Sequence, residues 1–168
     1  MQTAVGVFGS NEHINGIIPP ESREEIKEDN VLPKICPRFI ATDLCRERVG
    51  VHPCDKRRDI SEHQPLFPAI DFSMVESNED NMWKADVRET DEELVARGLK
   101  FMNWLWTFQE RDIAIVTHNR FSQHTLNALA NDCEKSLRNE ICEEFGNCEL
   151  RSMVIADGKV INVEGKSE

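Results

Sequence analysis

The chain has 168 residues, of which 39% are hydrophobic and 30% charged, a balance typical of one globular domain that excludes a wholly disordered protein. Its 31 acidic residues outnumber its 20 basic residues, and the net charge of −11 repels nucleic acids and anionic lipids. No apolar stretch approaches the roughly 20 residues of a membrane helix, and the first residues do not resemble a signal peptide. We therefore expect a single cytoplasmic domain over residues 1–168, with no nucleic-acid and no membrane partner.

The first part of the chain is irregular, since all seven prolines lie at or before Pro68. Residues 9–38 combine glycine, proline and an acidic run, which is typical of a long solvated loop. A loop of that length in a compact domain covers a site or is partly disordered, and the sequence leaves both alternatives open. A short strand is predicted at 39–44, and a short helix around Ser61 that ends before Pro65.

The second part of the chain is regular, and its first helix has a clear start. Thr90 and Glu93 have the spacing of a capping box, in which hydroxyl and carboxylate each satisfy an unpaired backbone N–H, so a helix is predicted to begin there. Its apolar residues recur at spacings of four, three and four, which predicts a stripe that packs on a sheet. These residues are Leu94, Gly98, Phe101 and Leu105.

A continuous β-branched run at 111–118 predicts a central strand of an α/β sheet, because both faces of such a strand are covered. Helices are predicted at 121–130 and 134–145. Strands are predicted at 149–156 and, after the hairpin signal Asp157-Gly158, at 159–163. This alternation of strands and helices predicts a layered α/β domain.

The six cysteines contain no C-x-x-C pair and the chain carries no secretion signal, so we expect free thiols and neither disulfides nor a structural zinc site. No metal and no cofactor is predicted.

His118 is the main candidate for chemistry. It stands at the carboxyl end of the predicted central strand, where α/β sheets bind ligands and the next helix offers its N-terminus to an anion. An imidazole there suits proton transfer, nucleophilic attack or phosphate binding, while the alternative is a histidine that only caps the helix or bonds to a backbone carbonyl. Glu47, just beyond an earlier strand, is a candidate acid or simply a surface carboxylate.

Five segments of the chain resemble one family. They are Leu-Cys-Arg-Glu at 44–47, Val-Gly-Val-His-Pro-Cys-Asp-Lys-Arg-Arg at 49–58, Phe-Pro-Ala-Ile-Asp-Phe at 67–72, Trp-Lys-Ala-Asp-Val-Arg-Glu at 83–89 and Asn-Cys-Glu-Leu-Arg-Ser-Met at 147–153. These strings resemble the plant phosphoglycerate mutase-like proteins of the histidine phosphatase superfamily. The resemblance implies a three-layer α/β sandwich, with helices on both faces of a mixed, mostly parallel sheet.

The resemblance also implies a site for phosphoryl transfer through a phosphohistidine. His118 takes the place of the family's second histidine, which binds the phosphoryl oxygens, and Glu47 takes the place of its proton donor. Asn119 and Arg120 follow His118 where the family has small residues, so Arg120 either crowds the phosphate site or replaces some of its positive charge.

The family's nucleophilic Arg-His-Gly motif does not occur in this sequence. The resemblance therefore implies a chain truncated at its N-terminus that lacks the first central strand and leaves a neighbouring strand unpaired. The leading hypothesis is a pseudoenzyme-like relative whose ancestral activity is phosphomonoester hydrolysis or phosphate transfer on a small phosphorylated metabolite of carbohydrate metabolism. The alternatives are a non-catalytic or regulatory protein that binds inorganic phosphate at His118 and Arg120, and self-association through the unpaired strand.

Overall fold

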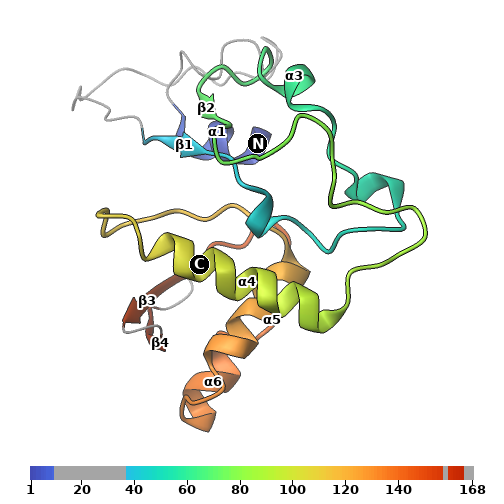
Figure 1. Cartoon of the computed structure of the whole chain (residues 1–168). Helices are drawn as coiled ribbons and strands as arrows, with labels where there is room; N and C mark the ends of the chain where they lie inside the picture. Colours follow the sequence, from blue (N-terminus) through green and yellow to red (C-terminus); the bar gives the residue numbers. More distant parts are fainter. Residues whose placement is uncertain (10–36, 157–158, 165–168) are drawn as a thin grey trace, which may run out of the picture. The chain divides into compact units, whose positions relative to one another are not determined.

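The computed structural model describes residues 1–9, 37–156 and 159–164. Packing divides the chain into two compact units, Met1–Asp43 with Arg57–Asn81, and Leu44–Lys56 with Met82–Glu168. Both units contain helices and strands, so the predicted α/β class is confirmed (Figure 1). The single domain over 1–168 stays a prediction, and the loop predicted at 9–38 lies outside the described residues from 10 to 36.

The first unit is built on a short parallel pair of strands. Its elements are α1 (Gln2–Phe8), β1 (Phe39–Ile40), α3 (Ile60–His63) and β2 (Ile70–Asp71). Phe39 pairs with Ile70 and Ile40 with Asp71. The strand predicted at 39–44 is thus confirmed for its first two residues only, and the helix predicted around Ser61 is confirmed. Its apolar core consists of Val5, Phe67, Ile70 and Phe72.

The second unit contains the longer helices. Its elements are η2 (Asp43–Cys45, whose first residue belongs to the first unit), η3 (Pro53–Asp55), α4 (Asp91–Leu105), α5 (Asn119–Leu129), α6 (Lys135–Ile141), β3 (Ser152–Ala156) and β4 (Lys159–Glu164). β3 and β4 form the predicted antiparallel hairpin, whose turn residues 157–158 lie outside the described residues.

Helix α4 begins where its capping box predicts. The Thr90 hydroxyl accepts a hydrogen bond from the Glu93 N–H at 3.2 Å, and the Glu93 carboxylate accepts one from the Thr90 N–H at 2.8 Å. The predicted apolar stripe packs on helix α5 as well as on the sheet residue Ile155. Gly98 permits this close packing, because a Cβ there would lie 2.2 Å from the Thr125 hydroxyl oxygen.

The central strand predicted at 111–118 is wrong for this structure. Residues 111–117 belong to no strand, and Ile113, Ile115 and Val116 are 42%, 41% and 39% exposed. Each of the two sheets in the described ranges has two strands, one sheet parallel and the other antiparallel. A β-branched run becomes a central strand only when neighbouring strands complete its ladder, and no described residue does so.

Helix α6 is shorter than the predicted 134–145 because a side chain from further along the chain takes up the carbonyls beyond its end. The Arg151 guanidinium donates to the Glu143 and Glu144 carbonyls at 2.7 and 2.8 Å and stacks 3.9 Å from the Phe145 ring centroid. These contacts fix a turn where further helical hydrogen bonds would have formed.

No helix in the described residues is long and apolar enough to cross a membrane. In the same residues, no group of three or more His, Cys, Asp and Glu side chains could hold a metal ion. No disulfide joins the five described cysteines, as the sequence predicts for these positions.

Candidate functional site

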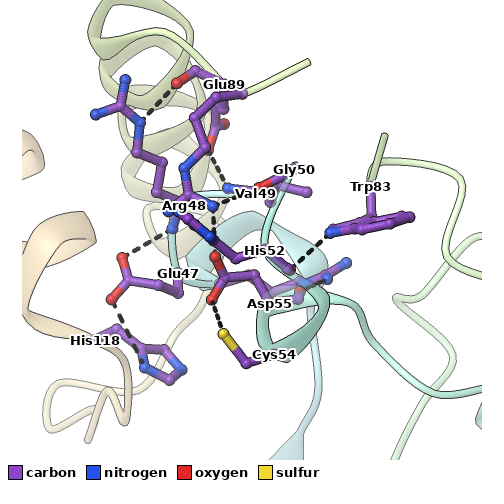
Figure 2. A network of polar contacts seen from close by, with 12 residues as sticks. Glu47, Arg48, Val49, Gly50, His52, Cys54, Asp55, Trp83, Glu89 and His118 are labelled. Atoms are coloured by element: carbon purple, nitrogen blue, oxygen red, sulfur yellow. Dashed lines mark hydrogen bonds and ion pairs between the residues drawn. The ribbon is translucent and has the colours of Figure 1, made fainter. Parts of the chain in front are cut away.

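The structure brings His118 and Glu47 together, although 70 positions of sequence separate them. His118 is the residue before the first turn of α5, and its Nδ1 atom lies 4.0 Å from Oε2 of Glu47 (Figure 2). The imidazole makes no capping hydrogen bond and its side chain is 61% exposed. His118 thus occupies the N-cap position, but its imidazole does not cap the helix through a hydrogen bond.

Glu47 belongs to a turn whose backbone is held by side chains. Four consecutive carbonyls, those of residues 44 to 47, each accept a side-chain hydrogen bond. Arg97 donates to the carbonyls of Leu44 and Arg46 at 2.9 Å each and to that of Glu47 at 3.2 Å. The Thr117 hydroxyl donates to the Cys45 carbonyl at 2.5 Å. The turn is thus fastened both to α4 and to the residue that precedes His118.

Arg97 can hold this turn because its own charge is neutralised. Its side chain is 6% exposed, and its guanidinium forms a two-point contact with the Glu89 carboxylate, 2.7 Å for each hydrogen bond. Planar fork-to-carboxylate contacts of this kind are strong and directional. Burial by itself would raise the pKa of Glu89, but the Arg97 hydrogen bonds and charge, the Val49 N–H and Arg48 outweigh it. The pKa of Glu89 therefore lies below its ordinary value.

The carboxylate of Glu47 is oriented by its own neighbour. Its Oε1 accepts a hydrogen bond from the Arg48 backbone N–H at 2.8 Å, which leaves Oε2 toward the imidazole (Figure 2). The Arg48 side chain turns away to the Glu89 carbonyl at 2.7 Å and to Asp91 at 3.0 Å. The Arg48 guanidinium thus contacts Glu89 and Asp91, and the Glu47 carboxylate has no guanidinium partner in the described residues.

The loop after the turn is fixed by close backbone contacts. Gly50 has a φ of +96°, and a Cβ there would lie 2.0 Å from the Val87 carbonyl oxygen, so glycine is required. The Arg88 guanidinium donates to the Gly50 carbonyl and to the Asp55 carboxylate, each at 2.5 Å. The Trp83 indole N–H donates to the His52 carbonyl at 3.0 Å (Figure 2). These hydrogen bonds hold the loop in place next to the turn that carries Glu47.

The two other predicted phosphate ligands have different surroundings. Asn119, the first residue of α5, donates from Nδ2 to Oε1 of Glu144 at 3.0 Å. Arg120 is exposed, and its side chain has no hydrogen bond or ion pair with any described residue. The Nδ2 group of Asn119 is thus engaged within the protein and its buried Oδ1 has no hydrogen-bond partner among the described residues, whereas the Arg120 guanidinium is open to an anion.

Sequence reasoning missed Arg97 and Glu89, the pair that holds the site together. One signal was present: Arg97 lies three residues after Leu94 and four before Phe101, within the apolar stripe of α4. A charged side chain on the buried face of a helix needs a partner, because an unpaired buried charge is costly. The identity of that partner depends on the tertiary structure.

An exposed imidazole beside a carboxylate at a helix N-terminus is an arrangement that suits acid–base chemistry and anion binding. Sequence comparison identifies relatives of the chain as a whole. Three Arabidopsis thaliana proteins match nearly the whole chain: phosphoglycerate mutase-like protein 1 at 54% identity over 96% of the chain, a phosphoglycerate mutase-like protein at 45% over 94%, and phosphoglycerate mutase-like protein 2 at 41% over 94%. The chain belongs to this phosphoglycerate mutase-like family.

The match covers only part of each relative. The chain spans 58%, 59% and 54% of their respective lengths. No protein-family model and no solved structure matches the chain.

Proposed function

We propose that the chain is a histidine phosphatase-superfamily protein that binds the phosphoryl group of a small phosphorylated metabolite, or inorganic phosphate, at His118. In this proposal the His118 imidazole and the Arg120 guanidinium contact the phosphoryl oxygens, with the backbone N–H of Asn119 at the helix N-terminus beside them. The observation that carries the proposal is the exposed imidazole 4.0 Å from the Glu47 carboxylate at the start of α5.

The implied reaction is phosphomonoester hydrolysis or phosphate transfer, with Glu47 giving its proton to the leaving oxygen. Phosphoryl transfer is catalysed mainly by in-line positioning and by neutralisation of the equatorial oxygens. The 168 residues contain no Arg-His-Gly motif, so the nucleophilic imidazole that would accept the phosphoryl group has no counterpart here. The proposal is therefore that turnover is strongly impaired while binding of the anion remains.

The first experiment measures binding with inorganic phosphate as the probe. Phosphate is titrated into the full chain while the imidazole signals are followed by NMR, with His118→Gln used to assign the signal of interest. The proposal expects a saturable shift of the His118 signal and loss of phosphate binding in His118→Gln. His52→Gln is the matched control, because His52 is another exposed imidazole, on the loop after the turn. An absent shift, or equal effects of the two substitutions, would overturn the proposal.

The second experiment measures turnover with p-nitrophenyl phosphate. Phosphate binding with no hydrolysis would favour a non-catalytic, regulatory anion-binding protein, a candidate supported by the open Arg120 guanidinium. Hydrolysis that disappears in both Glu47→Gln and His118→Gln would favour the enzyme. Labelled phosphohistidine found after incubation with a phosphodonor would contradict the proposal that the chain lacks a nucleophilic imidazole.

The family resemblance also leads us to propose the three-layer sandwich, with a mixed and mostly parallel sheet between helices. A crystal structure with one such sheet covered on both faces would support it. A structure that keeps two separate pairs of strands would contradict it.

A further inference from the structure

The segment Ile113–Val116 has the composition of a strand but none of a strand's contacts. It joins α4 to α5 as a trace without regular structure (Figure 1). Within the described residues its backbone makes no hydrogen bond, and none of its side chains belongs to an apolar core. Four consecutive apolar residues, three of them β-branched, are thus left open to solvent.

Such a segment is an efficient template for another strand. β-Branched residues favour extended backbone, and unpaired N–H and C=O groups along an extended edge pair readily with a second chain. Successive side chains of a strand point to opposite faces. Ile113 and Ile115 would share one face and Val116 the other, and all three are about 40% exposed, so both faces keep apolar surface that a second strand could cover. Lateral pairing is therefore the contact that this segment lacks.

We propose that this run is a self-association surface, at which two copies of the chain pair residues 112–118 as antiparallel strands across a twofold axis at Ile115. In this register Ile115 faces the same residue of the second copy, and Ala114 faces Val116. Ile113 faces Thr117, so apolar or β-branched side chains oppose one another along the central ladder. A twofold interface of this kind is closed, and it uses the same surface on both copies.

Charge selects this register. Asp112 of each copy faces His118 of the other, which places a carboxylate opposite an imidazole at both ends of the ladder. Position 119 begins helix α5, so the ladder ends at His118. A shift by one residue in either direction would lose both Asp112–His118 contacts.

The partner's chemistry follows from the same pattern. The segment has an acidic group before its apolar centre and a basic group after it, so an antiparallel copy of itself complements it at both ends. The net charge of −11 on each copy opposes association. This repulsion is largely screened beyond about 8 Å at physiological ionic strength, whereas contacts within the ladder are much closer. We therefore expect a reversible dimer and no open-ended polymer.

The test is sedimentation velocity of the full chain from about 1 µM to about 200 µM at physiological ionic strength. The proposal expects a monomer–dimer equilibrium in the unmodified chain. Ile115→Lys places two ammonium groups face to face on the twofold axis and should raise the dissociation constant at least about tenfold. Asp112→Asn removes both carboxylate–imidazole contacts and should raise it by about two- to thirtyfold.

Leu150→Lys is the matched control, since Leu150 is 68% exposed and lies outside the segment. It should leave the dissociation constant unchanged. A monomer at every concentration, larger assemblies without a dimer, or equal effects of Ile115→Lys and Leu150→Lys would each overturn the proposal.

Hydrogen exchange of the unmodified chain provides a measurement that does not depend on any variant. Amides of residues 112–118 should exchange more slowly as protein concentration rises. Protection that grows with concentration elsewhere, but not there, would contradict the pairing. Failure of this proposal would leave phosphate binding at His118 untouched, because that binding does not require a second copy of the chain.

Discussion

Two segments of the second unit, the turn at 44–47 and the run at 113–116, differ in how their backbone groups are hydrogen-bonded. Every carbonyl of the turn accepts a hydrogen bond from a side chain, three of them from the buried Arg97. The run has no such partner among the described residues, although it is far more apolar. Hydrogen-bond partners, and not hydrophobicity, thus distinguish the two segments in this structure.

The largest loss of stability is expected from Arg97→Met, which removes the donor to three carbonyls of the turn. It would leave three carbonyls without their donor and the Glu89 carboxylate buried without its counter-charge. Breaking one side of a buried pair costs about 3–5 kcal/mol of unfolding free energy. Urea unfolding followed by circular dichroism measures it. Arg120→Met, at an exposed arginine without a described partner, should change the unfolding free energy by less than about 0.5 kcal/mol. Similar losses in both variants would contradict the role of Arg97.

Glu89→Gln should come next, at about 2 kcal/mol near neutral pH, because a neutral amide leaves the Arg97 charge uncompensated. The folded-state pKa of Glu89 lies below its ordinary value of 4.5. Its contribution is therefore fully present above pH 4.5 and is lost as the pH falls from there through the folded-state pKa.

The pH dependence supplies the control for that variant. The difference in unfolding free energy between the unmodified chain and Glu89→Gln should shrink below pH 4.5. A difference that stays constant down to acid unfolding would show that the effect of the substitution is not due to charge.

Thr117→Val should destabilise the fold by about 1 kcal/mol, because the isosteric side chain leaves the Cys45 carbonyl without its donor. This change tests the fastening of the turn to the residue before His118. The NMR signal of the His118 imidazole should also shift, since its distance to Glu47 depends on that contact. Thermal unfolding together with this signal measures both effects. An unchanged melting temperature would argue that the hydrogen bond contributes nothing net.

The smallest effect on the monomer is expected two residues earlier. Ile115→Lys should change the unfolding free energy by less than about 0.5 kcal/mol in dilute protein, because the side chain is exposed and packs in no core. The measurement is made at the lowest concentration of the sedimentation series. A loss as large as that of Thr117→Val would mean that the run contributes to the packing of the monomer, and the contrast with the turn would fail.

Local signals predicted the positions of the longer helices, although α6 ends four residues before its predicted end. The start of α4 follows from the Thr90 and Glu93 side chains, which act on backbone groups within one turn. The helix at 121–130 and the hairpin after Ser152 were predicted for the same reason: their periodicity and turn residues act over a few positions. The strand at 111–118 was not predicted correctly, since strand formation requires distant partners that composition does not reveal.

The candidate site was predictable in part. His118 and Glu47 were identified from the sequence by position and by family resemblance, and the structure brings their side chains to 4.0 Å. The fastening by Arg97 and Glu89 was not identified, because only folding places the α4 side chains against the turn at 44–47.

By itself the amino-acid sequence determined the helix boundaries set by capping and the residue types that can bind an anion, since both depend on groups close together along the chain. It also determined the family, through strings such as those at 44–47 and 49–58. Only the tertiary structure decided that four successive carbonyls would be taken up by side chains and that the β-branched run would stay open. Hydrogen bonds between distant segments depend on which groups the fold brings close together, and the spacing of residues along the chain does not show this.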